Sequence, residues 1–142
     1  MLEARARRQI KAALVLKIAP DVSEADLDDI AALALDRELD GLIVGNTTIN
    51  RPDTLKSAHR AEAGGLSGAP LFQLSTRILA AMHQRVGERV PLIGTGGIFT
   101  VDDVLAKLAA GAVAVQVYSA LIYEGPGLVR RLKRGLAAAR RK

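Results

Sequence analysis

Short apolar segments alternate along the chain with stretches of helical periodicity. The apolar segments lie at 12–19, 41–45, 90–94 and 112–117, and none shows the polar alternation of a half-exposed strand. They are typical of parallel strands that are covered on both faces. Because a helical pattern follows each of them, the order predicts a parallel sheet with right-handed helical crossovers.

Capping residues and spacing indicate where the helices lie. Ser23 and Thr100 each precede acidic side chains in a pattern that opens helices, and Pro70 suits the first residue of a helix. The expected inward faces are Leu27, Ile30, Ala31 and Ala34 in the first helix, Leu71, Leu74, Ile78 and Met82 in the second, Val101, Val104, Leu105, Leu108 and Ala109 in the third, and Leu128, Leu132 and Leu136 in the last.

Four strand–helix units make half of a (βα)8 barrel, whose usual length is about 250 residues. A flavodoxin-like open sheet is the structural alternative. The polar motifs favour the barrel, because all of them fall at the C-terminal ends of strands. In a half barrel the inner face of the sheet lacks its opposite wall, and we expect Val15, Ile43, Ile93 and Val115 to lie on that face.

Two strand ends have the composition of a phosphate cradle. Gly96 and Gly97 follow the third strand, and Tyr118 and Ser119 follow the fourth. Their backbone N–H groups could hold an anion, and 119–123 could form one helical turn directed at it. We expect glycine at 96 and 97 because a side chain would hold the backbone away from the ligand. A plain tight turn is the alternative.

A long polar excursion separates the second strand from the second helix. Residues 49–69 have little helical pattern, and a loop of this length inside a compact domain is usually functional. We therefore expect a functional loop over 47–70. Arg51 and Arg60 within it are expected to be solvated, as are Arg130 to Arg134 on the last helix.

Composition narrows the possible classes of protein. The chain has 142 residues and is 49% hydrophobic, which suits one domain with a substantial core. It has no cysteine, so disulfides and thiolate chemistry are excluded. No apolar stretch is long enough to span a bilayer, and the charged first eleven residues lack the apolar core of a signal peptide. These features predict a soluble cytoplasmic chain.

The net charge of +5 comes from the two ends of the chain. Residues 12–129 carry nine basic and 14 acidic side chains, so the body is acidic. With two Phe, two Tyr and no Trp, the chain lacks the aromatic platforms of a nucleic-acid-binding surface, and we expect no nucleic-acid partner. His59 and His83 have no partners at metal-ligand spacing, so no metal site is expected either.

Five motifs in register resemble a known family. They are KIAPD at 17–21, NTT at 46–48, GGLSG at 64–68, GTGGI at 94–98 and VYS at 117–119. The series resembles the C-terminal half of class 2, quinone-linked dihydroorotate dehydrogenase, an FMN enzyme of pyrimidine synthesis. The resemblance runs from about residue 12 to residue 136. It implies that the chain is the C-terminal (βα)4 half of a TIM barrel.

The resemblance implies a role for particular residues. Lys17 resembles the lysine that contacts the flavin ring, and Asn46 and Thr47 resemble the pair that hydrogen-bonds orotate. The positions that resemble FMN contacts, mainly through the backbone, are Gly68, Gly97, Tyr118 and Ser119. Gly45 departs from the family pattern, which usually has Thr or Ser there, so a hydroxyl contact is lost while a backbone contact could remain.

The family's activity is the oxidation of dihydroorotate to orotate, with a hydride passed to FMN and electrons passed on to quinone. The resemblance places the serine base and the quinone-facing, membrane-associated helices in a first half that these 142 residues do not include. We therefore expect a half-barrel fragment, inactive alone, with no catalytic residue of its own and with residues 1–11 ending a helix of the missing half. The parent enzyme is expected to be peripheral on the cytoplasmic face of the cell membrane.

Two interpretations of the function remain open, and the first is the oxidoreductase half barrel just described. The second is a non-enzymatic (βα)4 module that binds phosphate or FMN. In either case the open strands need a partner, because edge strands present unpaired backbone groups. We expect that partner to be the missing N-terminal half or a second copy of the chain.

Overall fold

The computed structural model describes residues 12–141, and the expected helix end at 1–11 lies outside that range. Its four strands are β1 (Val15–Ile18), β2 (Gly41–Val44), β3 (Leu92–Thr95) and β4 (Ala112–Gln116). They form one parallel sheet in the order β1-β2-β3-β4. The predicted parallel α/β fold is confirmed. A sequential strand order also differs from that of a flavodoxin-like sheet, in which the chain reverses direction.

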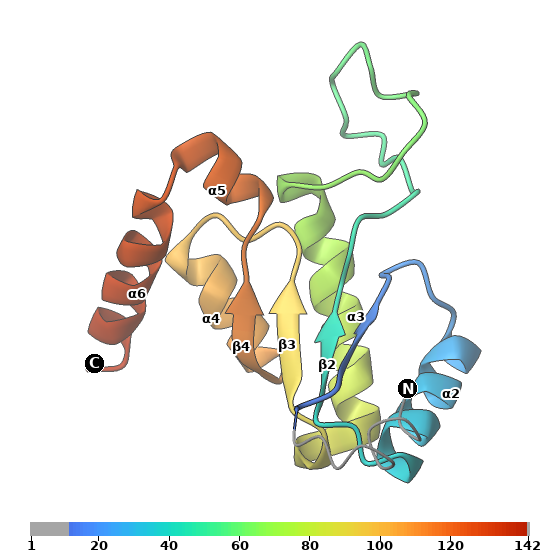
Figure 1. Cartoon of the computed structure of the whole chain (residues 1–142). Helices are drawn as coiled ribbons and strands as arrows, with labels where there is room; N and C mark the ends of the chain where they lie inside the picture. Colours follow the sequence, from blue (N-terminus) through green and yellow to red (C-terminus); the bar gives the residue numbers. More distant parts are fainter. Residues whose placement is uncertain (1–11, 142) are drawn as a thin grey trace.

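The helices form one layer. They are α2 (Glu24–Asp36), α3 (Phe72–Val86), α4 (Val101–Ala109), α5 (Ser119–Glu124) and α6 (Gly127–Ala139), with short 3-10 turns η1 (Ala69–Leu71) and η2 (Gly87–Arg89). In Figure 1, α3 and α4 lie behind the sheet, α2 lies beside β1, and α5 and α6 lie beyond β4. Within the described residues no helix covers the near face, as in one wall of a barrel.

The helix starts agree with the capping patterns. Ser23 and Thr100 both form capping boxes, in which each hydroxyl accepts from the backbone N–H of an aspartate three residues on. The hydrogen bonds from Ser23 also lower the pKa of Asp26. Pro70 instead lies in η1, and α3 begins two residues later at Phe72. The 3-10 turn closes on the carbonyl of Gly68, so Pro70 starts this turn rather than the helix.

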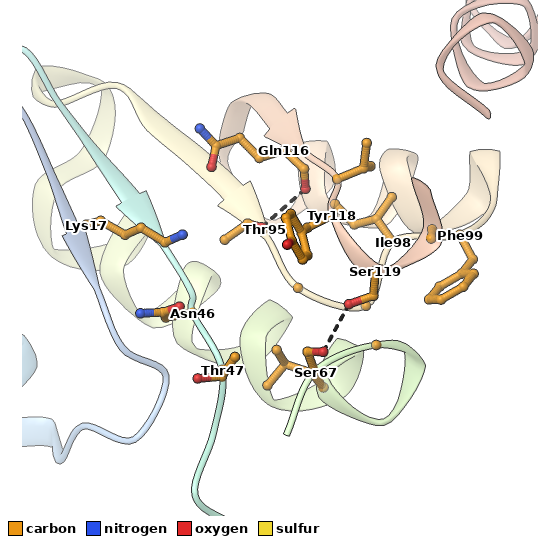
Figure 2. Close-up of a pocket in the computed structure, with 16 residues that line it drawn as sticks. Lys17, Asn46, Thr47, Ser67, Thr95, Ile98, Phe99, Gln116, Tyr118 and Ser119 are labelled. Carbon is orange, nitrogen blue, oxygen red and sulfur yellow. Dashed lines mark hydrogen bonds between the residues drawn. The ribbon is translucent and has the colours of Figure 1, made fainter. Parts of the chain in front are cut away.

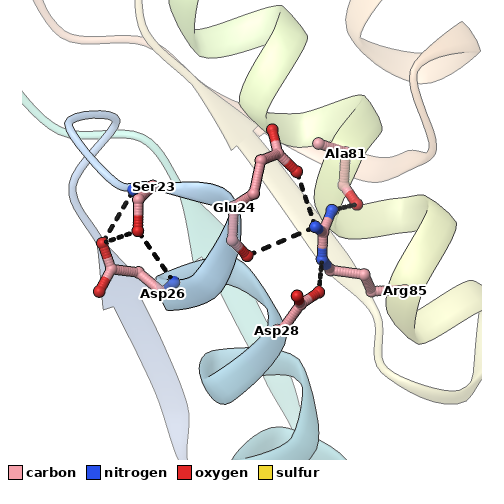
Figure 3. A network of polar contacts seen from close by, with 6 residues as sticks. All are labelled: Ser23, Glu24, Asp26, Asp28, Ala81 and Arg85. Atoms are coloured by element: carbon pink, nitrogen blue, oxygen red, sulfur yellow. Dashed lines mark hydrogen bonds and ion pairs between the residues drawn. The ribbon is translucent and has the colours of Figure 1, made fainter.

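An ion-pair network joins α2 to α3. The half-buried guanidinium of Arg85 donates to Asp28 Oδ1 at 2.6 Å and to Glu24 Oε2 at 2.7 Å, and to the carbonyl of Ala81 at 3.0 Å (Figure 3). The bonds to Asp28 and Glu24 raise the pKa of Arg85. This network fixes how α2 and α3 lie against each other.

The core has two parts. One packs β1, β2 and β3 against α2 and α3 through residues such as Leu27, Leu42 and Leu79. The other joins α4, α5 and α6 through residues such as Val104, Ala120 and Leu128. Most of the predicted inward faces are buried or half-buried, but Ala109 is exposed. Lys107 is buried on the same helix instead, so α4 is turned further toward α3 than its apolar pattern indicates.

The bare face of the sheet also differs from the prediction at one residue. Lys17, Ile43, Ile93 and Ala114 are aligned across the four strands and form a row on the face opposite the helices. The pairing of β3 with β4 shifts between Leu92 and Ile93. This irregularity turns Val115 toward α4 and α6, where it packs in the second core cluster. The expectation that Val115 lies on the bare face was wrong for this reason.

The loop between β2 and η1 is ordered by two side chains. Asp21 accepts from the hydroxyl of Thr48, from the N–H of Ile49 at 2.9 Å and from Asn50 Nδ2 at 2.8 Å. Arg51 donates to five backbone carbonyls, those of Thr48, Ile49, Asn50, Glu62 and Gly64. The prediction that Arg51 is solvated was therefore wrong: it clamps the base of the loop. Arg60 is exposed, as predicted.

Candidate functional site

A pocket of about 500 Å³ lies at the carboxyl ends of the four strands. Its lining comes from the ends of β1, β2, β3 and β4 and from the segments that follow them. The residues are Lys17, Asn46, Thr47, Ser67, Gly68, Leu71, Thr95, Gly96, Gly97, Ile98, Phe99, Gln116, Val117, Tyr118, Ser119 and Ala120. The volume is in the range of small-molecule and cofactor sites.

Seven of the eight residues predicted from the sequence line this pocket: Lys17, Asn46, Thr47, Gly68, Gly97, Tyr118 and Ser119. They come from five separate segments of the chain, and the parallel strands bring them to one edge of the sheet. In Figure 2, Lys17 and Asn46 lie at one end of the pocket, while Ser67 and Ser119 lie at the other. One end is thus cationic and amide-bearing, and the other consists of glycine backbone and hydroxyl groups.

Gly45 is the predicted residue that does not line the pocket. It is buried and has a φ of +120°, in the region that favours glycine. A Cβ at this position would lie 2.8 Å from the carbonyl oxygen of Thr95 and 3.1 Å from its Cγ2. The absence of a side chain at Gly45 therefore lets the ends of β2 and β3 approach each other.

The glycines of the cradle are required for a different reason from the predicted one. Gly96 and Gly97 have φ values of +95° and +75°. A Cβ on Gly97 would lie 2.5 Å from the backbone nitrogen of Phe72, and one on Gly96 would lie 2.9 Å from Ser75 Oγ. Side chains here would strike the start of α3 behind the turn rather than a ligand in front of it. The turn can therefore rest on α3 while it lines the pocket.

The opposite wall of the glycine turn is formed by the end of the long loop and the start of α5. The hydroxyls of Ser67 and Ser119 are 3.1 Å apart. A Cβ on Gly68 would lie 3.9 Å from the Cβ of Ser119, so glycine at 68 leaves this wall open to a ligand. The predicted helical turn is present as α5, which begins at Ser119. Tyr118 is 77% exposed, so it borders the mouth of the pocket.

Several lining residues were not predicted. Thr95 and Gln116 end β3 and β4, and Thr95 Oγ1 donates to the carbonyl of Gln116 at 3.2 Å. They lie in register with each other, so the strand ends themselves were the signal that could have identified them. Ile98, Phe99 and Leu71 add apolar lining from the segments that border α3 and α4.

The described residues contain no group of three or more His, Cys, Asp or Glu side chains that could hold a metal ion. His59 pairs with Glu62 at 2.7 Å on the surface of the loop. Over residues 12–141, no helix is both long and apolar enough to cross a membrane.

A parallel sheet with its pocket at the carboxyl ends of the strands defines the class of α/β proteins that bind ligands at this edge. The family model described as dihydroorotate dehydrogenase matches residues 1–139. The chain belongs to the dihydroorotate dehydrogenase family.

Curated relatives are named dihydroorotate dehydrogenase (quinone), which confirms the resemblance to the quinone-linked class. The protein of Parvibaculum lavamentivorans is 54% identical over 133 residues, covering 94% of this chain and 38% of the relative. That of Azorhizobium caulinodans is 54% identical over 125 residues, covering 88% of this chain and 35% of the relative. The chain therefore spans little more than a third of the length of these relatives.

The solved structures give the same result. The Eimeria tenella dihydroorotate dehydrogenase in complex with ferulenol superposes with a TM-score of 0.86 and 46% sequence identity. The match covers 89% of this chain and 33% of that one. The fold of this chain is therefore that of a part of a dihydroorotate dehydrogenase.

Proposed function

We propose that the chain supplies the flavin-phosphate and orotate side of the active site of a quinone-dependent dihydroorotate dehydrogenase. The observation that carries this proposal is the convergence of Lys17, Asn46, Thr47, Gly68, Gly97, Tyr118 and Ser119 on one pocket. Each of these residues resembles a binding residue of the family in sequence. Seven residues from five segments meet in a single cavity of suitable size.

The donor set of the pocket fits FMN. Gly68 is buried, and without a side chain its backbone is open to close approach by a ligand, while the nearest atom to a Cβ there would be the Ser119 Cβ at 3.9 Å. The glycine turn of residues 96–97 and the backbone of Tyr118 and Ser119 would hold the phosphate group. Within the described residues, the N–H of Gly97 makes no hydrogen bond to the protein. FMN, when bound, would supply the capacity to accept a hydride.

Lys17 and Asn46 would act at the other end of the pocket. Lys17 lies near the end of β1, on the bare face of the sheet, and lines the pocket, so its ammonium group would face a bound flavin ring. A cation there stabilises negative charge that builds up as the flavin is reduced. Asn46 and Thr47 offer an amide and a hydroxyl to the planar polar ring of orotate.

The complete reaction removes two electrons from dihydroorotate, as a hydride to FMN and a proton to a base, and passes the electrons to a quinone. We assign no base to this chain. The hydroxyls of Ser67 and Ser119 bond to each other, and Ser75 is buried behind the glycine turn. The base and the quinone contacts are proposed to come from parts of the family's fold that the chain does not span. A location in the cytoplasm, with the complete enzyme peripheral on the membrane, is proposed on the same basis.

The test separates binding from catalysis. The fluorescence of FMN should be quenched when FMN binds to the purified chain, and the backbone amide signals of Gly97 and Ser119 should shift first. Riboflavin, which lacks the phosphate, should bind more weakly. Adding the N-terminal portion of a relative should then restore oxidation of dihydroorotate with a quinone acceptor. Binding without restored turnover would favour a non-enzymatic FMN-binding module. If FMN shifted only the amide signals of Arg130 to Arg134, the proposed site would be wrong.

A further inference from the structure

Lys107 is a buried cation behind the pocket that the proposed function does not use. Its side chain is 0% exposed, and its Nζ donates to Ser75 Oγ at 2.6 Å. The same ammonium group lies 5.1 Å from the centre of the Phe72 ring, a cation–π arrangement. Its stem fills the space beside Gly94, where a Cβ would lie 3.3 Å from the Lys107 Cδ. The position is therefore built to hold this side chain.

The two partners of Lys107 are the residues on which the glycine turn rests. Ser75 Oγ lies 3.1 Å from the carbonyl oxygen of Gly96, and a Cβ on Gly96 would touch the same hydroxyl. The backbone of Phe72 is the surface against which Gly97 packs. A continuous path of contacts thus runs from the Lys107 ammonium group through Ser75 to a residue that lines the pocket.

No carboxylate neutralises this ammonium group at close range. The ion pairs found among the described residues do not include Lys107. Burial lowers its pKa to about 8, and the charge of Asp103, one turn earlier on α4, opposes that shift. The carboxylate of Asp103 is already bound to the N–H groups of Phe99 and Thr100.

Other charged groups on the elements packed against α4 lie elsewhere. β3 and β4 carry no charged side chain. From α3, Arg77 is exposed, His83 packs against Gly111 beyond the end of α4, and Arg85 pairs with α2. The basic residues of α6, namely Arg130, Arg131, Lys133 and Arg134, are exposed. Lys107 therefore keeps a positive charge near pH 7 in a buried site behind the glycine turn.

We propose that Lys107 is a positioning residue, which holds the Gly96–Gly97 turn through Ser75 and Phe72 and supplies the positive charge that an anionic group bound at that turn requires. The second part rests on the proposed FMN site. A bound phosphate and Lys107 would stabilise each other's charges, so phosphate binding should raise the pKa of Lys107. Binding should then weaken as pH rises and the free protein loses this proton.

The experiment compares FMN and riboflavin binding to the whole chain between pH 7 and 9.5. FMN phosphate is fully ionised throughout, since its second pKa is about 6. We expect FMN affinity to fall about tenfold over this interval, which corresponds to roughly one unit of coupled pKa change. Riboflavin carries the same ring without the phosphate, so its affinity should stay nearly constant. Lys107→Met should bind FMN about tenfold more weakly at pH 7 and lose the pH dependence.

Lys133→Met, which removes an exposed lysine on α6, is the matched control and should behave as the wild type. The positioning role can be tested without any ligand. In Lys107→Met the amide signals of Gly96 and Gly97 should shift, and these amide protons should exchange faster with solvent. Ser75→Ala replaces this variant if Lys107→Met does not fold. Unchanged amide signals would overturn the positioning role. If the wild-type chain did not bind FMN, the proposed function would be rejected. The amide signals of Gly96 and Gly97 would still decide whether Lys107 positions the turn.

Discussion

Gly45 and Thr95 are packed so closely at neighbouring strand ends that a Cβ on Gly45 would lie 2.8 Å from the carbonyl oxygen of Thr95. Gly45 directly follows β2, and Thr95 is the last residue of β3. Lys17 and Thr95 both line the pocket. Glycine at position 45 thus allows the close approach of two segments that border the pocket.

Replacing Gly45 by Ala should destabilise the fold by about 2–4 kcal/mol, because it adds overpacking to the strain of a positive φ. Gly64→Ala is the matched control. Gly64 has nearly the same φ, +123°, but no atom lies within 4 Å of its missing Cβ. Urea unfolding of both variants isolates the steric contribution. Equal losses would mean that the approach of β2 and β3 is not constrained at this point.

Lys17→Ala, in the chain reassembled with the N-terminal portion of a relative, should slow flavin reduction by about tenfold or more while FMN affinity changes less. The cation interacts best with charge that develops on reduction, so it acts on the transition state more than on binding. Stopped-flow absorbance gives the reduction rate, and a titration gives the affinity. A loss of affinity with an unchanged reduction rate would contradict this role for Lys17.

Lys107→Met should leave the fold intact and stabilise it by about 1–2 kcal/mol at pH 7. Lowering the pKa of this lysine from 10.5 to about 8 corresponds to roughly 3 kcal/mol of penalty for the buried charge. About 1 kcal/mol is lost in return, because Ser75 loses a hydrogen-bond partner.

The sign of the pH dependence follows from the same shift. Between pH 8 and 10.5 the unfolded chain binds more protons at this lysine than the folded chain does, so the stability contributed by this group rises over that interval. The variant lacks this increase, so its advantage should fall to about zero near pH 10 and reverse at higher pH, where only the lost hydrogen bond remains. The urea unfolding midpoints of the wild type and of Lys107→Met, measured at pH 7 and pH 10, test this pH dependence. A variant that is much less stable at pH 7 would show that the ammonium group is net stabilising.

Local patterns predicted much of this fold, because its elements are specified locally. The strands are continuous apolar runs, and Ser23 and Thr100 carry complete capping boxes in the sequence. The site was predictable for a similar reason: parallel strands bring their carboxyl ends together, so motifs that follow them must meet. Gln116 was missed because it belongs to no recognisable motif, and Thr95 was missed because only the glycines of the GTGGI motif indicated a binding role.

The errors arise where long-range packing overrides the local pattern. A shift in the pairing of β3 with β4 moved Val115 to the other face, and nothing in the strand's own sequence indicates it. Lys107 interrupts the apolar pattern of α4, and a lysine there is ordinarily expected in solvent. Arg51 resembled a solvated loop residue because its carbonyl partners are distributed over residues 48–64.

Arg51→Ala should loosen the loop of residues 45–68 while changing global stability by less than about 1 kcal/mol, because the loop adds little to the core. Hydrogen exchange should accelerate at Thr48 and Leu66, which exchange two backbone bonds at the base of the loop. Arg51→Lys should not restore protection, since a single ammonium group cannot reach both sides of the loop. The exposed Arg60 provides the control variant. Exchange rates that change equally in both arginine variants would argue against a specific clamp.

The bare face of the sheet carries Ile43 and Ile93 and ends at two open edges. β1 and β4 are edge strands within the described residues, and neither edge is paired. Apolar surface contributes roughly 25 cal/mol per Å² when it is buried, so this face should associate with a partner surface. We expect the isolated chain to form homodimers or larger aggregates at micromolar concentration. Adding the N-terminal portion of a relative should convert these into a complex with that portion.

Ile43→Glu should shift the chain toward monomer, because a buried carboxylate at the new interface would lack a partner. The matched control is Leu33→Glu, which changes a 49% exposed apolar residue on α2, on the helical side of the sheet, and should leave association unchanged. Sedimentation velocity over a concentration series measures both variants. A wild-type monomer that unfolds cooperatively would show that the sheet covers its own face and edges, and the need for a partner would then be rejected.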